Sequence, residues 1–351
     1  MVKRFVQPSN NRTIKQSNNQ TNITFELTNL IQSMYDNNSK GISYSAGFFI
    51  LIALAIAGIV IGTMLSIPIW TSMTGRSIMN MKDELGNPAY SNAFKLMQSV
   101  STLFGFFIPA VVTATFLNRR PYSLLGFTTG VQGKQIGVVF AIMFLALFIS
   151  TSFGYFNQHI PVSPSWKITF QKLEDEYNSQ VQAIMQLKTF GDYLLGLLIM
   201  GLLPAICEET LFRGGLQNFL TRWTHRPWLA ILIVSILFSA VHFSFYGFLP
   251  RMFLGLVLGY IYYYTGSLWL SILAHFFNNA IAVSQFYFSN SPSLKQMAQE
   301  NPSLPLVYLG LIAIPFAVAL LVLLKKISPR QQESNLSIDD IREKAPWEIN
   351  N

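Results

Sequence analysis

Eight apolar segments, each close to the length of a membrane-spanning helix, run through this 351-residue chain and constrain its fold. A helix needs about 20 apolar residues to cross the hydrocarbon core of a bilayer. Because backbone groups inside a membrane must be hydrogen-bonded internally, such segments form helices. The sequence therefore predicts an all-α polytopic membrane protein with about eight transmembrane helices, over residues 47–70, 94–117, 135–156, 190–220, 228–246, 249–265, 267–288 and 304–325.

The composition agrees with a membrane protein. The chain is 51% hydrophobic and 11% charged, whereas soluble domains carry about 25% charged residues. The net charge of +8 is best explained by Lys and Arg in cytoplasmic loops. We therefore expect the lipid bilayer as surroundings and no nucleic-acid partner. The single cysteine, Cys207, excludes a disulfide within the chain.

The polar segments divide the chain into three parts. Residues 1–45 are a polar N-terminal arm, partly disordered, in which 23–36 could form a helix on the bilayer surface. Residues 46–326 are the transmembrane domain, and residues 327–351 are a polar cytoplasmic tail. The excess of Lys and Arg on one side of the spans places both termini in the cytoplasm. The connection 157–189, with an acidic run at 174–176, is then an outer loop.

Residues 190–288 stand apart because they carry ionisable side chains inside apolar segments. A charged group at the bilayer centre costs about 2.5–3.5 kcal/mol on insertion scales, so such groups have partners or line a water-filled cavity. By contrast, Arg251 begins its segment and is expected to extend to the membrane interface. The candidate site residues within this core are Glu208, Glu209, Arg213, His242, His275 and Asn279.

The spacing of these residues predicts how they meet. Glu209 and Arg213 are four residues apart on one helix face and can form an ion pair. Glu208 is rotated by about 100° and can point into a cavity. At 1.5 Å per residue, Glu208 and His242 lie roughly 20 Å inside their segments, and His275 and Asn279 roughly 12 and 18 Å. The fourth, fifth and seventh segments thus bring polar side chains to overlapping depths.

Two kinds of hydrolytic site fit these side chains. Peptide hydrolysis needs a base that activates water, such as Glu208, and donors for the oxyanion, such as histidine and asparagine side chains. Two histidines and one glutamate are also a plausible ligand set for a divalent metal such as zinc. The residues alone do not distinguish a water activated by a glutamate from a water bound to a metal. Glutamates and histidines in spans also form proton relays, so a proton-coupled transporter is an alternative, although the groups are confined to one cluster.

Three motifs then suggest a family. Glu208–Arg213 fits EExxxR, Phe238–His242 fits FxxxH, and His275–Asn279 fits HxxxN. Together, in this order and on separate segments, they resemble the CPBP family of intramembrane proteases, which includes CAAX prenyl proteases and bacteriocin-processing proteins. The resemblance covers residues 190–288. It implies an eight-span helical fold and an intramembrane (metallo)endopeptidase that acts on membrane-embedded or membrane-associated peptides or proteins.

By position, the resemblance also implies roles for the candidate residues. Glu208 would activate the water and His242 would assist it, while His275 and Asn279 would stabilise the oxyanion or help to bind a metal. Glu209 and Arg213 would hold the site together. The expected location is the inner (cell) membrane of a bacterium. A non-catalytic membrane protein that binds peptides, confers immunity or assists secretion is the remaining alternative.

Overall fold

The all-α architecture is confirmed. The structure, a computed structural model, describes residues 38–288 and 304–328, and no strand of a sheet occurs in these ranges. Helices occupy all eight predicted positions. The predicted surface helix at 23–36 lies outside the described residues, as does most of the polar arm and tail. Outside the fourth position, the helices are α2 (Tyr44–Thr74), α3 (Ser91–Thr102) continued by η3 (Leu103–Phe107) and α4 (Ile108–Leu117), α6 (Gly133–Gln158), α11 (Pro227–Ala240), α12 (Phe248–Thr265), α13 (Leu268–Phe288) and α15 (Leu304–Lys326).

Five helical segments of the described chain are long and apolar enough to cross a membrane by length and composition. They are Tyr44–Thr74, Pro88–Leu117, Gly133–Gln158, Phe190–Thr224 and Leu306–Lys326. The other three predicted spans, α11, α12 and α13, are helices but do not belong to this set, and α11 has only 14 residues. The chain is thus a polytopic membrane protein, and the number of eight crossings stays a prediction.

The outer faces of the peripheral helices are apolar. On α2, Ile56 and Met64 are exposed, and on α15, Ile312 and Phe316 are exposed. A soluble monomer rarely exposes apolar patches of this extent. In a bilayer these side chains meet lipid tails, which explains why the sequence of α2 is apolar on all sides.

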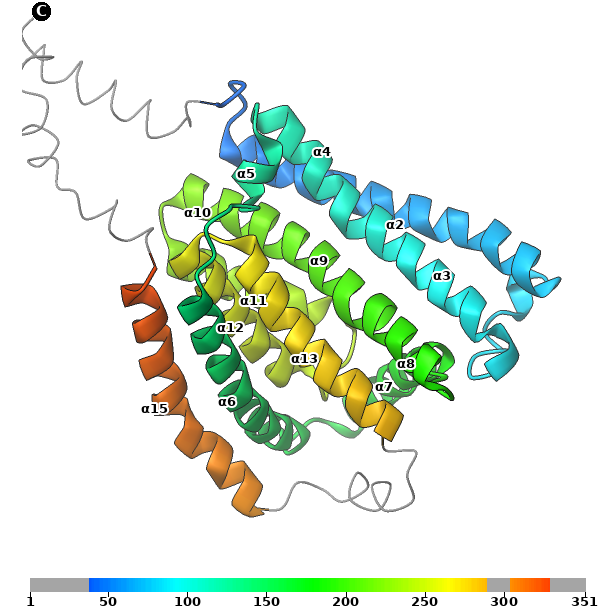
Figure 1. Cartoon of the computed structure of the whole chain (residues 1–351). Coiled ribbons are helices and arrows are strands. Elements are labelled where there is room, and N and C mark those ends of the chain that lie inside the picture. The colour runs from blue at the N-terminus through cyan, green and yellow to red at the C-terminus, as the bar shows by residue number, and fades with distance from the viewer. Residues whose placement is uncertain (1–37, 289–303, 329–351) are drawn as a thin grey trace, which may run out of the picture.

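The helices that carry the candidate residues lie inside the bundle (Figure 1). Helix α2 packs against α3 and α4 on one side, and α15 packs against α6 on the other. Helix α12 packs against α6, α11 and α13. The apolar core that joins them includes Leu51, Ala114, Ile142, Phe238 and Leu258.

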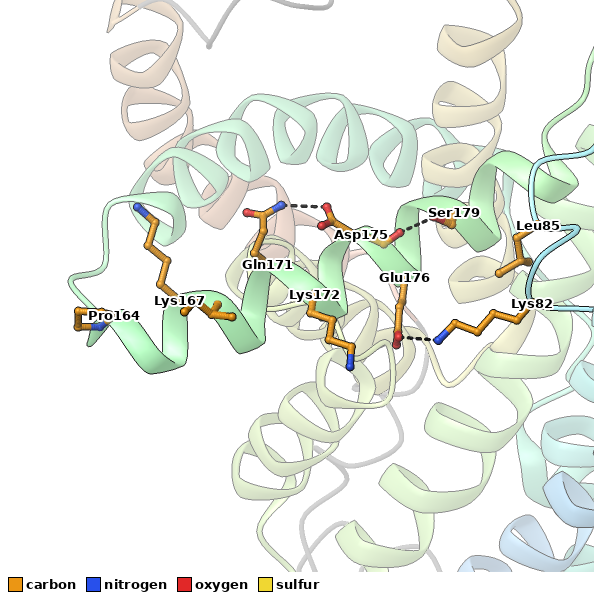
Figure 2. A pocket seen from close by; sticks show the side chains of 10 residues that line it. Lys82, Leu85, Pro164, Lys167, Gln171, Lys172, Asp175, Glu176 and Ser179 are labelled. Atoms are coloured by element: carbon orange, nitrogen blue, oxygen red, sulfur yellow. Dashed lines mark hydrogen bonds and ion pairs between the residues drawn. The ribbon is translucent and has the colours of Figure 1, made fainter.

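The prediction of a loop over residues 157–189 is wrong, because this segment contains the 21-residue helix α7 (Pro164–Ile184). A search for apolar segments passes over α7, since polar side chains alternate with apolar ones along it. Helix α7 joins the far ends of α6 and the fourth segment. Figure 2 shows acidic and basic side chains along α7: Glu176 forms an ion pair of 3.2 Å with Lys82, from the connection between α2 and α3. Glu174 accepts a hydrogen bond of 2.7 Å from Ser244, so two of the acidic side chains at 174–176 have partners outside α7.

Candidate active site

The fourth segment is helical throughout, from α8 (Phe190–Gly196) through η4 (Leu197–Leu202), α9 (Leu203–Glu209) and η5 (Thr210–Gln217) to α10 (Asn218–Thr224). The portions η4 and η5 are π-helical, with wider turns. Pro204 is the second residue of α9, just after η4, and a proline has no backbone N–H to donate to the preceding turn. Wider turns accommodate such a gap, and they occur often at functional sites. The chain thus stays helical through the EExxxR motif.

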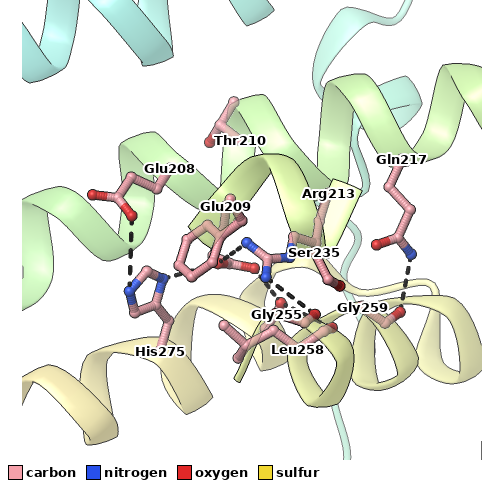
Figure 3. A network of polar contacts seen from close by, with 12 residues as sticks. Glu208, Glu209, Thr210, Arg213, Gln217, Ser235, Gly255, Leu258, Gly259 and His275 are labelled. Atoms are coloured by element: carbon pink, nitrogen blue, oxygen red, sulfur yellow. Dashed lines mark hydrogen bonds and ion pairs between the residues drawn. The ribbon is translucent and has the colours of Figure 1, made fainter. Parts of the chain in front are cut away.

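Glu209 is the centre of a buried polar network (Figure 3). Its carboxylate accepts a hydrogen bond of 2.8 Å from Nη1 of Arg213, the pair predicted from their spacing. Nδ1 of His275 lies 2.8 Å from the same oxygen. The Glu209 side chain is 0% exposed. A carboxylate removed from water in this way is stable only when its oxygens are paired.

Ser271 completes this network and was missed by the sequence reasoning. Its hydroxyl donates to the second carboxylate oxygen of Glu209, and the Ser271 side chain is buried. The signal that could have found it is its spacing, since Ser271 lies four residues before His275 on one face of α13. Both oxygens of Glu209 are therefore engaged.

Glu208, by contrast, is available to a reactant. Its side chain is 14% exposed, and its Oε2 lies 4.0 Å from Nε2 of His275. This separation is longer than a hydrogen bond. Figure 3 shows the His275 ring between the two glutamates. Of the two adjacent carboxylates, that of Glu209 is held in place by hydrogen bonds, and that of Glu208 faces a cavity.

His242 lies in the turn after α11, because that helix ends at Ala240. Its predicted place within the fifth span, 228–246, is corrected accordingly. The side chain is nevertheless fixed: Nδ1 lies 2.8 Å from the carbonyl oxygen of Phe238. Since a carbonyl accepts, Nδ1 carries the proton, and Nε2 remains for a reactant.

The sequence-predicted residues meet around one cavity of about 560 Å³. Glu208, His242, His275 and Asn279 all line it. The amide nitrogen of Asn279 makes a long contact of 3.4 Å with the carbonyl oxygen of Gly201. Helix α7 closes one side of the cavity, through residues that include Tyr177 and Ile184. Glu209 and Arg213 do not line the cavity and lie behind its wall.

Arg213 connects the network to α12. Its Nη2 donates to the carbonyl oxygen of Gly255 over 3.2 Å, and its guanidinium lies 4.5 Å from the ring centre of Phe238. One turn further on each helix, Gln217 donates to the carbonyl oxygen of Gly259 over 2.9 Å. A Cβ on Gly255 would come within 2.9 Å of Ser235. Glycines at these two positions therefore allow the close helix contact.

The side chains around the cavity include the residues of the predicted metal site. Within residues 38–288 and 304–328, no three side chains of His, Cys, Asp or Glu are grouped as ligands of a metal ion. Nδ1 of His275 faces Glu209, and Nδ1 of His242 faces a carbonyl oxygen. Both Nε2 atoms are thus left for another partner, and histidine ligands of a metal commonly have their other ring nitrogen held in this way. The zinc site stays a prediction.

Comparison with known families gives the class of this region. Residues 190–281 match the family described as Rce1-like, type II CAAX prenyl endopeptidase. Residues 190–281 are an Rce1-like domain of the CPBP family. All six candidate residues fall within the Rce1-like domain, which confirms the family suggested by the three motifs.

Two bacterial proteins resemble part of this chain. The uncharacterized protein YpbD of Bacillus subtilis (strain 168) is 32% identical over 98 residues, which cover 27% of this chain and 47% of that protein. An uncharacterized 24.3 kDa protein of Escherichia coli is 38% identical over 92 residues, which cover 25% of this chain and 42% of that protein. The chain thus spans somewhat less than half the length of the curated relatives that it matches. No solved structure matches the chain.

Proposed function

We propose that this protein is an intramembrane endopeptidase that hydrolyses peptide bonds of membrane-associated substrates with a water molecule activated by Glu208. The observation that carries the proposal is the shared cavity of about 560 Å³, which Glu208, His242, His275 and Asn279 all line. The Rce1-like match over residues 190–281 supports the endopeptidase class.

The first step is the attack of water on the peptide carbonyl. The carboxylate of Glu208 takes a proton from the water while the water oxygen bonds to the carbonyl carbon. His242 orients this water through Nε2, because its Nδ1 is occupied by the carbonyl oxygen of Phe238. The carbonyl π bond opens, and its oxygen becomes an oxyanion.

The oxyanion is stabilised by donors from α13. The side-chain amide of Asn279 donates to it, and His275 donates from Nε2 when its ring is protonated. The proton held by Glu208 then moves to the peptide nitrogen, and the C–N bond breaks. The oxyanion re-forms the carbonyl double bond as the amine leaves, so the products are a carboxylic acid and an amine, and Glu208 is restored as a base.

Glu209 and Arg213 position these groups without touching the substrate. Glu209 fixes the orientation of the His275 ring through Nδ1, at 2.8 Å. Arg213 balances the charge of Glu209, since their atoms are 2.8 Å apart. A reacting site whose supporting residues are fixed in this way keeps its geometry close to the productive one.

We also propose the orientation of the chain in a bacterial inner membrane. Basic residues follow α4, precede α11 and end α15, at Arg119, Arg120, Arg226, Lys325 and Lys326. Basic loops stay in the cytoplasm, so both termini are cytoplasmic in this proposal. Helix α7 lies between α6 and α8, at the end of the bundle away from these basic residues. In this proposal it is on the outer side.

Peptide cleavage by purified protein tests the proposed function. Wild type, Glu208→Gln and His242→Ala are purified in detergent and incubated with a quenched-fluorescence peptide library. We expect cleavage by wild type and a loss of about a hundredfold or more without either side chain, within the range for general acid–base groups. Equal cleavage by all three proteins, or none by wild type in detergent and in liposomes, would overturn the proposal. The zinc alternative stays a prediction, and the same assay with a chelator measures it.

A further inference from the structure

Arg251 is a charged residue beside the cavity that the proposed reaction does not use. It lies in the first turns of α12, and the guanidinium carbon lies 4.7 Å from the ring centre of Tyr177 on α7. Its Nη1 is buried and makes no hydrogen bond. The side chain therefore folds against α7, and its extension to the membrane interface stays a prediction.

The guanidinium has no carboxylate partner within the part of the chain that the structure describes. The acidic groups of the neighbouring α7 are engaged elsewhere: Glu174 accepts from Ser244 over 2.7 Å, and Glu176 pairs with Lys82 over 3.2 Å. The side chain is half-buried, and a charge that is partly removed from water without an opposite charge is costly. Arginine stays protonated in proteins, so this positive charge persists.

The start of α12 holds no charge that would balance the guanidinium. Its first N–H groups are already engaged, since Phe248 donates to the carbonyl oxygen of Phe245 over 3.0 Å and Leu249 donates to Oδ1 of Asn157 over 2.9 Å. The first turn contains no acidic residue. Since Gly247 has no Cβ, the guanidinium can fold close to its backbone. An anion at this place would meet the unpaired Nη1 of the guanidinium.

This place adjoins the proposed site. Tyr177, whose ring covers Arg251, lines the same cavity as His242. The charge of Arg251 also acts on His242. The Tyr177 ring thus contacts the guanidinium and also forms part of the cavity wall.

We propose that Arg251 binds a carboxylate of the peptide substrate beside His242. A guanidinium offers parallel N–H donors that match the two oxygens of a carboxylate. The carboxylate is either the C-terminus of the substrate or an Asp or Glu side chain. This inference rests on the proposed function, because it identifies a feature of the substrate of the same site.

Matched peptides test the inference. One quenched-fluorescence sequence is made with a free C-terminal carboxylate, with a C-terminal amide, and as an amide with one internal Asp. Wild type, Arg251→Gln, Arg251→Lys and the control Arg226→Gln are compared by kcat and KM. Arg226 is exposed at the opposite end of the bundle, before α11. Thermal unfolding in detergent establishes that each variant is folded.

For wild type we expect a KM at least about tenfold lower for one carboxylate peptide than for the plain amide, the size of a charge-assisted hydrogen bond. The peptide that shows this difference identifies the source of the carboxylate. Arg251→Gln removes the difference, Arg251→Lys retains part of it, and Arg226→Gln keeps it. Equal KM values for all three peptides with wild type, or an unchanged difference in Arg251→Gln, would overturn the inference.

A binding measurement separates this inference from the proposed function. Fluorescence anisotropy of the labelled peptides is recorded with Glu208→Gln and with the double variant Glu208→Gln/Arg251→Gln. A preference for the carboxylate that disappears in the double variant supports the Arg251 site even if no protein cleaves any peptide. Equal binding of carboxylate and amide peptides to Glu208→Gln would overturn the Arg251 site while leaving cleavage to be judged from the kinetics.

Discussion

Nδ1 of His275 lies 2.8 Å from the carboxylate of Glu209, two side chains that are 66 residues apart in the sequence. The contact joins the fourth segment to α13 and fixes one ring nitrogen of His275. The other nitrogen faces Glu208 at 4.0 Å. This relationship assigns different tasks to two adjacent glutamates and leads to the following predictions.

Arg213→Met will destabilise the protein strongly. The change leaves the buried carboxylate of Glu209 without its cation, which costs about 3–5 kcal/mol. Unfolding in detergent, followed by circular dichroism, measures the loss. The double variant Glu209→Gln/Arg213→Met removes both charges, and we expect it to be more stable than Arg213→Met. A double variant no better than the single one would show that the pair is not the source of the loss.

Ser271→Ala will reduce turnover by weakening the support of Glu209. Removing a hydrogen bond to a charged group costs about 1.5–3 kcal/mol. We expect kcat to fall with little change in KM, and Ser271→Thr to restore part of it because it keeps a hydroxyl. The control is Ser267→Ala, since the buried hydroxyl of Ser267 makes no hydrogen bond. Equal effects of the two alanine variants would contradict a positioning role of Ser271.

Gly255→Ala will disturb the contact between α11 and α12. The added methyl group would come within 2.9 Å of Ser235, and the carbonyl of Gly255 accepts from Arg213. Overpacking of this kind typically costs about 1–3 kcal/mol. Gly137→Ala on α6 is a matched control, because a Cβ there meets nothing within 4 Å. A melting temperature of Gly255→Ala equal to that of the control would refute the close contact.

The predictable parts of this fold are those that depend on residues close together in the sequence. Apolar length placed eight helices, and the spacing of four residues placed the pair of Glu209 and Arg213. Helix α7 was missed because hydropathy detects apolar helices and passes over amphipathic ones. The partners of Ser271 and Arg251 lie on other helices, 62 residues away for Ser271. Such contacts depend on the packing of the bundle, which no local pattern encodes.

The orientation of the chain can be read from cysteine labelling. In a Cys207→Ala background, Asp175→Cys on α7 and Arg120→Cys after α4 are treated in intact cells with a membrane-impermeant maleimide. Because basic loops remain cytoplasmic, we expect Asp175→Cys to be labelled at once and Arg120→Cys only after permeabilisation. The reverse pattern would place α7, and the cavity wall that it forms, on the cytoplasmic side.

The central claim is that Glu208 activates a water molecule for peptide hydrolysis. The most direct measurement is mass spectrometry of peptide products formed in water enriched with heavy oxygen, by wild type and by Glu208→Gln. The account predicts one heavy oxygen in the new carboxyl terminus with wild type, and almost no product with Glu208→Gln although the variant is folded and binds the peptide. Cleavage by Glu208→Gln at the rate of wild type would contradict the account.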